Sequence, residues 1–340
     1  MIVGTERSGS NLLRLMLDSH PNIAIPHPPH FMRYLAPLAF TYGDLTQEVN
    51  RRRLVRDALS LLRAHILPWD CKIDEDLAVL ESRPTVFGVT SALYEQYRRA
   101  TGKPRWGCKS TFMVDYVDDA LAEYPAARLI WLVRDPLDVA ASMRQSVFGP
   151  CQPRLSAELW QRQQWTAKVA TRHWGVATIR MVRYEDLVTN PRPELDSIVR
   201  HLGEEFDEAM LAHHDTAAAR RMARMCESWQ RTALPVSTDR IGSHWDGLTA
   251  RERQQVLAVT GELRSELGYD RLAVRPCQAG ARLLLRLQDI GLRTAVEYRS
   301  VRRDLNWRQR WRRDTAVRWI KLRAAWRTVG RKIGERPMIR

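Results

Sequence analysis

The chain has 340 residues, 44% of them hydrophobic, which is enough to bury one large core or two smaller ones. No apolar run in the sequence approaches the ~20 residues that a membrane-spanning helix needs, which excludes that class. The five cysteines are scattered and include no C-x-x-C pair. This pattern argues against a zinc site or a disulfide framework and favours a reducing compartment.

The net charge of +15 is concentrated at one end of the chain. Residues 280–340 carry 18 Lys and Arg against five Asp and Glu, so +13 of the total lies there and the rest is nearly neutral. This asymmetry predicts two functional units: an α/β domain over residues 1–275 and a basic, Trp-containing helical tail over residues 276–340.

The first segment, "MIVGT", has the pattern of a strand and follows no charged leader or apolar signal region. We interpret the protein as cytoplasmic on this basis. The next residues read "ERSGSN", in which Gly4 and Gly9 have the spacing of the Walker phosphate-binding loop. Ser10 stands in place of the loop lysine, and Asn11 replaces the hydroxyl that binds magnesium. The pattern therefore indicates an anion-binding loop that lacks the metal ligand.

Further along the chain, strand-like and helix-like segments alternate. Strands are expected at 1–5, 105–110, 127–134 and 177–187, and helices at 11–19, 51–66, 88–100 and 191–203. The strand 127–134 is apolar on both faces, as strands of parallel sheets are. Asp135 follows it as a predicted helix N-cap, with Pro136 at the first helical position. The alternation predicts a three-layer α/β fold with a parallel sheet, whose ligands bind at the carboxyl ends of the strands.

Two of these strand ends carry residues suited to phosphate groups. At the first, the N–H groups of residues 7–11 open a helix, and Arg7 adds a positive charge with a bidentate donor fork. At the second, Arg134 ends a strand and Ser142 follows two helical turns later. Each feature alone is compatible with an ordinary turn or a solvated arginine. Their combination on one sheet is more specific and predicts two separate phosphate sites.

The segments "GTERSGSNLLRLMLDSHP" and "RLIWLVRDPLDVAASM" resemble the two nucleotide-binding motifs of sulfotransferases that use 3′-phosphoadenosine 5′-phosphosulfate (PAPS). The similarity is greatest to carbohydrate and tyrosyl-protein sulfotransferases and their bacterial relatives. It spans about residues 1–250 and does not include the tail. It implies that the first loop grips the 5′-phosphosulfate, whereas Arg134 and Ser142 grip the 3′-phosphate. The implied nucleotide contacts are Thr5, Arg7, Ser8, Gly9, Ser10, Asn11, Arg134, Ser142, Tyr184, Gly242, Ser243 and Trp245.

The resemblance also accounts for the missing metal ligand. The transferred sulfonate carries one negative charge, where a γ-phosphate carries about two. Arg7, backbone N–H groups and a lysine can then supply the electrostatic stabilisation that magnesium gives to kinases. We therefore expect PAPS as the co-substrate and no metal.

The catalytic base is where this sequence departs from the family pattern. In the relatives a loop often reads "I-P-P-E-T-H-F" and its glutamate is the base, but the loop here is "IPHPPHF" over residues 25–31, with Pro28 at that position. His27 and His30 flank it, and a neutral imidazole is a competent base near pH 7. His30 matches a histidine that relatives carry beside their glutamate, so we favour His27. The alternative is that both histidines only shape a proline-rich turn.

Two further segments extend the resemblance. Lys109 in "WGCKST" matches a lysine that stabilises the leaving bisphosphate, and the segment 240–248 resembles a late loop that closes over the nucleotide. For both, the simpler interpretation is a residue at a strand end or in a surface turn.

The basic tail has tryptophans interleaved with arginines. At helical spacing, Trp319, Leu322, Trp326 and Val329 share one face, while most Lys and Arg lie elsewhere. This pattern is typical of a basic amphipathic helix that binds an anionic membrane surface. The alternative is a helical cap on the catalytic domain, and both can hold. Nucleic acid is not expected as a partner, because no recognised binding motif accompanies the charge.

Together these features predict a sulfotransferase that moves a sulfuryl group from PAPS to an acceptor hydroxyl of a glycan or glycolipid. Two alternatives remain open at this point. One is a P-loop-like kinase or NTPase, which would need magnesium and a loop lysine. The other is a non-catalytic protein that binds PAPS or its bisphosphate product and has lost the base at Pro28.

Overall fold

The computed structural model describes residues 1–274 and 282–334, with side chains to residue 328. Its contacts divide the chain into two compact units. Unit 1 comprises Met1–Pro21, Lys109–Asp118 and Ala126–Leu305, and unit 2 comprises Asn22–Cys108, Asp119–Pro125 and Asn306–Arg340. The predicted domain boundary between residues 275 and 276 lies outside the described residues and stays a prediction.

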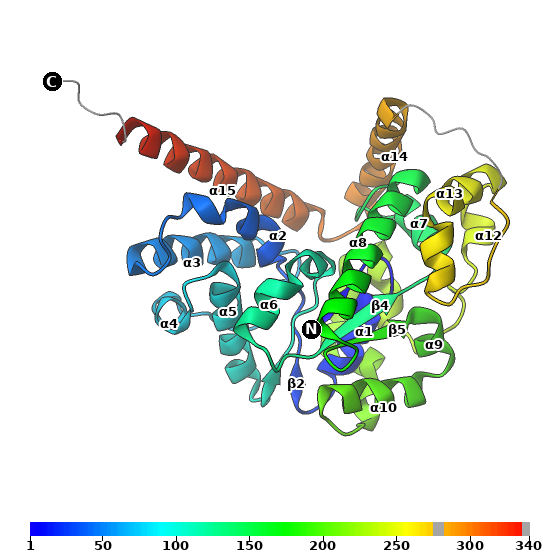
Figure 1. Cartoon of the computed structure of the whole chain (residues 1–340), viewed down its shortest axis with the longest axis horizontal. Helices are drawn as coiled ribbons and strands as arrows, with labels where there is room; N and C mark the ends of the chain where they lie inside the picture. The colour runs from blue at the N-terminus through cyan, green and yellow to red at the C-terminus, as the bar shows by residue number, and fades with distance from the viewer. Residues whose placement is uncertain (275–281, 335–340) are drawn as a thin grey trace. The chain divides into compact units, whose positions relative to one another are not determined.

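Unit 1 contains a three-stranded parallel sheet in the order β1 (Ile2–Gly4), β4 (Leu129–Val133), β5 (Ile179–Arg183). Every residue of β4 is buried, as expected for the central strand of a parallel sheet. Figure 1 shows β4 and β5 running side by side. The parallel arrangement is confirmed, although the strands are short and the fold is mostly helical.

The predicted strand 105–110 is only partly confirmed. Unit 2 holds a two-stranded parallel sheet of β2 (Ile23–Ala24) and β3 (Arg105–Trp106). The chain then leaves the strand at Gly107, whose N–H donates to the carbonyl of Ala24 at 2.8 Å. In unit 1, Lys109 forms a single parallel bridge with Ile2. The segment therefore forms a two-residue strand followed by an isolated bridge, instead of one continuous strand.

The helices of unit 1 surround this sheet. The helix after β4 confirms the predicted cap, because the carboxylate of Asp135 accepts a hydrogen bond from Leu137 N and Pro136 is the first helical residue. The α-helices of unit 1 are α1 (Ser10–Asp18), α7 (Pro136–Arg144), α8 (Pro153–Trp174), α9 (Tyr184–Thr189), α10 (Pro191–Leu202), α11 (Ala217–Met225), α12 (His244–Gly247), α13 (Ala250–Glu266) and α14 (Arg282–Arg303). Short 3-10 helices lie at Thr111–Tyr116, Glu208–Met210, His213–Asp215 and Glu227–Ala233. The helix α6 (Val117–Glu123) spans the division between the units.

The long helix α8 braces both strand ends that the sequence singles out. Its fully buried Gln164 donates to the hydroxyl of Thr5 at 3.0 Å, at the end of β1. Its fully buried Trp160 donates from the indole N–H to the carbonyl of Arg134 at 3.0 Å, at the end of β4. These bonds satisfy polar groups that burial would otherwise penalise. They therefore fix the two strand ends at which ligands are expected.

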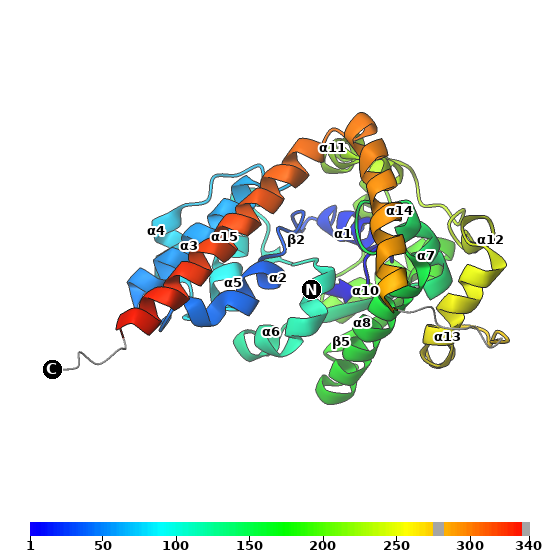
Figure 2. The ribbon, with the colours of Figure 1, turned by 90° about the horizontal axis from the view of Figure 1, so that it is seen from above.

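Helices also dominate unit 2. They are α2 (Phe31–Leu35), α3 (Glu48–Arg63), α4 (Glu75–Glu81), α5 (Val86–Thr101) and α15 (Trp307–Gly334), with a 3-10 helix at Ala36–Thr41. Figures 1 and 2 both show α15 lying alongside α3. Within the residues that the structure describes, no helix combines the length and apolar character needed to cross a membrane.

Candidate nucleotide site

The turn from β1 into α1 is built on two glycines that the sequence requires for different reasons. A Cβ atom at Gly4 would lie 2.3 Å from the carbonyl oxygen of Leu132, so glycine allows β1 to approach β4 closely. Gly9 has a φ of 86°, in the left-handed region, and precedes α1. A Cβ atom there would lie 2.4 Å from the ring of Tyr184. The two glycines therefore allow close packing, Gly4 against the neighbouring strand β4 and Gly9 against Tyr184 at the start of α9.

Arg7 lies inside this turn with a φ of 68°. Among the described residues, only Arg7 and His30 are non-glycine residues with positive φ. Such conformations carry strain and concentrate at functional sites. The backbone of Arg7 therefore supports a functional role independently of its charge.

The side chain of Arg7 reaches across to the second predicted phosphate site. Its Nε donates to Ser142 Oγ at 3.0 Å, and its Nη2 donates to the carbonyl of Ser228 at 3.3 Å. Loss of hydration lowers the pKa of the guanidinium, and the nearby positive charges of Arg134 and Arg240 lower it further. In the described part of the chain no carboxylate forms an ion pair with Arg7, so an anion placed here would meet a strong positive field.

Arg134 is buried at the end of β4. Its Nη1 donates to the carbonyl of Arg7 at 3.0 Å, and its Nη2 donates to the carbonyl of Arg240 at 2.6 Å. Its Nε is buried and has no hydrogen-bond partner in the described residues. The guanidinium lies 4.5 Å from the centre of the Tyr184 ring, a cation–π distance. The two strand ends are therefore joined through one arginine.

A pocket of about 530 Å³ lies over this turn, within the usual size range of ligand sites. Its walls combine the β1–α1 turn, the ends of β4 and α7, and the segment 227–237. The lining includes Arg7, Gly9, Ser10, Asn11, Arg134, Ser142, Tyr184, Ser228, Trp229, Arg231, Arg240, Ser243, Gly247 and Arg299. Five of these residues are arginines, and the buried Oδ1 of Asn11 has no partner in the described residues. The pocket therefore fits an anionic ligand that also offers hydrogen-bond donors.

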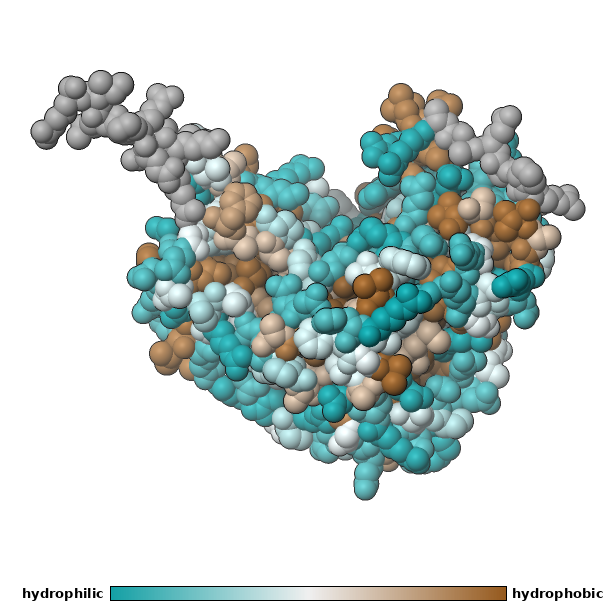
Figure 3. Space-filling model, in the orientation of Figure 1, coloured by the Kyte–Doolittle hydropathy of each residue, from teal (hydrophilic) through white to brown (hydrophobic). Residues whose placement is uncertain are grey.

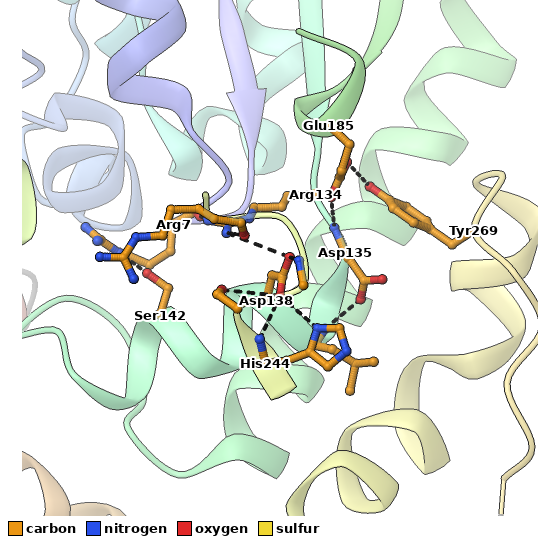
Figure 4. A network of polar contacts seen from close by, with 12 residues as sticks. Arg7, Arg134, Asp135, Asp138, Ser142, Glu185, His244 and Tyr269 are labelled. Atoms are coloured by element: carbon orange, nitrogen blue, oxygen red, sulfur yellow. Dashed lines mark hydrogen bonds and ion pairs between the residues drawn. The ribbon is translucent and has the colours of Figure 1, made fainter. Parts of the chain in front are cut away.

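Asp138 on α7 anchors the late loop that the sequence analysis connects with the nucleotide. Its carboxylate accepts hydrogen bonds from Gly242 N at 2.9 Å, from His244 N at 3.0 Å and from His244 Nδ1 at 2.8 Å. Figure 4 shows these contacts beside Arg134, whose Nη2 lies 3.9 Å from the carboxylate. Burial opposes ionisation of Asp138, but the hydrogen bonds from His244 and the charge of Arg134 prevail and lower its pKa.

A second group of contacts holds the end of β4 against the rest of unit 1. Arg264 pairs with the carboxylate of Asp135 at 2.6 Å, and Asp135 N donates to Glu185 at 2.9 Å. Tyr269 donates from its hydroxyl to the other oxygen of Glu185 at 2.8 Å. Burial raises the pKa of Glu185. These residues are occupied with one another, which indicates a supporting role for the site.

The pocket gathers many, but not all, of the predicted nucleotide contacts. Arg7, Gly9, Ser10, Asn11, Arg134, Ser142, Tyr184 and Ser243 line it. Gly242 and Trp245 do not, and Trp245 is 65% exposed. Thr5 and Ser8 are fully buried behind the turn, and Lys109 is buried without lining this pocket. The roles of all these residues toward a nucleotide stay predictions.

The two predicted base residues belong to unit 2. His27 is buried, and its Nδ1 lies 2.8 Å from Nε2 of His65, while its carbonyl accepts from the indole of Trp69 at 2.9 Å. His30 is only partly buried and is held at a φ of 58° as it leads into α2. Sequence reasoning missed His65, because 38 residues separate it from His27.

The segment 227–237 is a further part of the pocket that no sequence pattern predicts, and it supplies Ser228, Trp229 and Arg231 to the lining. It carries no glycine-rich motif and follows no strand, so spacing gave no signal. For Asp138 the sequence offers a weak indication. An acid four residues after Arg134 can form an i,i+4 pair with it.

Comparisons with known proteins agree with this geometry. Residues 1–208 match a family model described as the sulfotransferase family. The chain is 26% identical to nodulation protein NoeE of Sinorhizobium fredii, with 88% of this chain and 71% of that protein covered. It is 23% identical to the protein-tyrosine sulfotransferase of Drosophila melanogaster, covering 81% of this chain and 52% of that protein, about half its length.

Solved structures show the fold. The sulfotransferase domain of an olefin synthase from Synechococcus PCC 7002 superposes with a TM-score of 0.52 at 21% identity, covering 79% of this chain and 94% of that one. The sulfotransferase domain from the curacin biosynthetic pathway gives a TM-score of 0.50 at 17% identity, covering 80% and 97%.

Proposed function

The chain belongs to the sulfotransferase family and is a PAPS-dependent sulfotransferase, and we propose that its acceptor is a hydroxyl of a glycan or glycolipid. The observation that carries the proposal is the arginine-lined pocket at the carboxyl ends of β1 and β4. It lies where ligands bind in open parallel sheets. The glycan assignment rests on the resemblance of the first motif to carbohydrate sulfotransferases.

In this proposal the two arginines hold different ends of the nucleotide. Arg7 and the N–H groups that open α1 hold the 5′-phosphosulfate, and Arg134 with Ser142 holds the 3′-phosphate. The buried Nε of Arg134 is a donor that a phosphate oxygen can satisfy. The bond from Arg7 Nε to Ser142 Oγ supports coupling between the two ends. Tyr184 packs against both Gly9 and Arg134 and sets the distance between the sites.

The proposed sulfuryl transfer accounts for every bond and proton without a metal ion. The acceptor oxygen forms a bond to sulfur, the bond between sulfur and the bridging oxygen breaks, and the acceptor proton passes to a base on the enzyme. The products are a sulfate ester and the 3′,5′-bisphosphate. Lys109 is proposed to stabilise charge on that leaving group, as the family resemblance implies.

We assign the base to His27, with His65 as the residue that orients it. A catalytic base held by a second polar side chain is the usual arrangement in enzymes that activate a hydroxyl. The 2.8 Å separation of His27 Nδ1 from His65 Nε2 supports this assignment. His30 is the alternative, and its strained backbone supports it.

A protein tyrosine is a second candidate acceptor. Two relatives, from Drosophila melanogaster and Danio rerio, are named protein-tyrosine sulfotransferases, the second at 23% identity over 79% of this chain. A tyrosine hydroxyl is more acidic than a sugar hydroxyl and makes a smaller demand on the base. The replacement of the family's glutamate by Pro28 favours neither acceptor.

The test incubates the enzyme and radiolabelled PAPS with a cell extract, which is then fractionated into lipid, polysaccharide and protein. Label in the lipid or polysaccharide fraction is the expected result, and Arg134→Gln should reduce it. Label confined to protein and released as tyrosine sulfate would replace the glycan assignment by the tyrosine one. Bisphosphate binding without label in any fraction would favour a non-catalytic protein instead.

A further inference from the structure

The outward face of α15 carries a row of tryptophans that the proposed reaction does not use. Trp311, Trp319, Leu322 and Trp326 are exposed by 68%, 59%, 50% and 75%. At 100° per residue they fall within an arc of about 80° on one side of the helix. Large aromatic side chains gathered in this way on a surface helix indicate a binding face.

The opposite face of α15 is fully engaged within unit 2. Ile320 and Ala324 are 1% and 2% exposed. Arg323 and Arg327 donate to the two carboxylate oxygens of Asp57 at 2.5 and 3.0 Å. Tyr42 donates to the same carboxylate at 2.8 Å, and Arg327 lies 4.5 Å from the centre of its ring. The helix is therefore held in place by its inner face, which leaves the tryptophan row displayed on a fixed support.

The positive charge around this row of tryptophans indicates which kind of partner the face binds. Arg312 and Arg318 are exposed directly beside the tryptophans, and Lys321 is exposed further round the helix. Asp314, the one acid of the described part of α15, is paired with Arg313. Tryptophan prefers the boundary between lipid headgroups and acyl chains, and arginine and lysine bind anionic headgroups. Both preferences are met together at an anionic lipid surface. Val329, expected on the same face, has a side chain outside the described residues.

We propose that the outer face of α15 docks the enzyme on an anionic lipid bilayer, with Trp311, Trp319 and Trp326 at the headgroup level. The inner face stays packed on unit 2 while this happens, so the helix needs no rearrangement. Docking in this way does not depend on the identity of the acceptor. It would bring the enzyme to acceptors that are themselves at a membrane surface.

A second exposed apolar surface, at the start of α14, is the alternative membrane-docking site. Leu283, Leu284 and Leu287 are exposed where α14 begins, and Figure 3 shows apolar side chains gathered at that end of the helix. No tryptophan accompanies them, and α14 is tied to unit 1 through Asp289, which accepts from Cys151 N at 2.7 Å and Gln152 N at 2.9 Å. A leucine patch without interfacial aromatics is the weaker match to a bilayer boundary.

The test uses the full chain and co-sedimentation with vesicles of phosphatidylcholine containing phosphatidylserine, compared with phosphatidylcholine alone. The wild type should sediment with the anionic vesicles at low salt and be released as salt screens the charges. Trp319→Ser with Trp326→Ser should lower the partition coefficient by about tenfold or more. Arg318→Gln with Lys321→Gln should lower it about fivefold per charge and weaken the salt dependence. The matched control is Trp165→Ser, which removes a 48% exposed tryptophan from α8 and should change nothing.

Unchanged partitioning in the tryptophan variant would overturn the proposal, provided its melting temperature equals that of the wild type. Loss of binding in a Leu283→Ser, Leu287→Ser variant alone would move the docking surface to α14 and overturn it as well. A third outcome is that the wild type does not bind vesicles but dimerises as its concentration rises, and that the tryptophan variant stays monomeric. This would show that the face pairs with a second copy of the chain. Bisphosphate binding is measured in parallel, so failure of docking is separable from failure of the catalytic assignment.

Discussion

Arg323 and Arg327 of unit 2 differ from Arg7 and Arg134 of unit 1 in the partners that surround them. In unit 2, Arg323 and Arg327 both reach the carboxylate of Asp57, so their charges are compensated within the fold. In unit 1, Arg7 has only a hydroxyl and a carbonyl as described partners, and the nearest carboxylate to Arg134 is 3.9 Å away. The charge of an arginine that is hydrogen-bonded to a carboxylate is compensated within the fold, whereas an arginine whose hydrogen bonds go to neutral acceptors keeps more of its field for a ligand anion. From their bonding partners we therefore predict that Arg323 and Arg327 are structural and that Arg7 and Arg134 bind the ligand.

The largest expected effect tests the division of labour between binding and proton transfer. His27→Ala should lower kcat by ~10²–10⁴-fold while 3′,5′-bisphosphate affinity stays nearly constant, because the base acts only in the transfer step. The acidic limb of the pH–rate profile should disappear or move. Single-turnover kinetics with labelled PAPS and calorimetric bisphosphate titration measure the two quantities.

His65→Ala is the companion variant, since a residue that merely packs would not move the pH profile. We expect a smaller loss of kcat with a shifted acidic limb, and partial recovery in His65→Asn. If His30→Ala shows the loss and His27→Ala stays active, the base is His30. Full activity in both would place the base elsewhere.

The second-largest expected effect is the loss of bisphosphate affinity when an arginine of the pocket is replaced, compared with replacement of an arginine of unit 2. Arg7→Gln and Arg134→Gln should each weaken bisphosphate binding by ~1.5–3 kcal/mol, the range for hydrogen bonds to charged groups. Arg323→Gln should leave this affinity unchanged and lower the melting temperature. Removing the 3′-phosphate from the ligand should weaken binding by the wild type far more than by Arg134→Gln. Equal sensitivity in both proteins would contradict the assignment of Arg134.

A smaller effect concerns Asp138, which anchors the loop 240–247 through several hydrogen bonds. Asp138→Asn should weaken bisphosphate binding by about 1 kcal/mol, because the loop carrying Ser243 loses charge-assisted bonds. The folded state lowers the pKa of Asp138, so its carboxylate stabilises the fold above its ordinary pKa of about 4. That contribution is lost as the pH falls through the lower, folded value.

Thermal melts from pH 7 to pH 3 measure this linkage. The wild type should lose stability more steeply in the acid range than Asp138→Asn. Parallel curves would show that Asp138 does not contribute as a carboxylate. Normal bisphosphate affinity in the variant would separate the loop from the nucleotide site.

The last prediction is that removal of metal ions has no effect on the enzyme. If arginines and backbone N–H groups balance the charge of the sulfonate, EDTA should change neither bisphosphate affinity nor sulfate transfer. Transfer that stops with EDTA and returns with magnesium would mean that the arginines of unit 1 do not suffice. The comparison on which the other predictions rest would then need revision.

Local signals in the sequence account for much of the fold and part of the site. The alternation of strands and helices, the Asp135–Pro136 helix start and the Gly4–Gly9 loop depend on neighbours within a few residues, and the structure contains them. The sequence pattern does not predict the helix α8, although the helix is long. Its buried polar residues, such as Gln164, interrupt the apolar pattern because they are satisfied by partners distant in sequence.

Short motifs in the sequence indicate the family by resemblance. Short-range spacing predicts the basic amphipathic character of the C-terminal helix and the two strand ends that we propose to bind phosphate groups. Which arginines are compensated depends on the folded chain, since Asp57 and Arg327 are 270 residues apart and Arg7 and Ser142 are 135 apart. The contact between His27 and His65 and the place of α14 and α15 in different units likewise arise only on folding. Charge pairing and burial depend on contacts between distant segments, and those contacts exist only once the chain has folded.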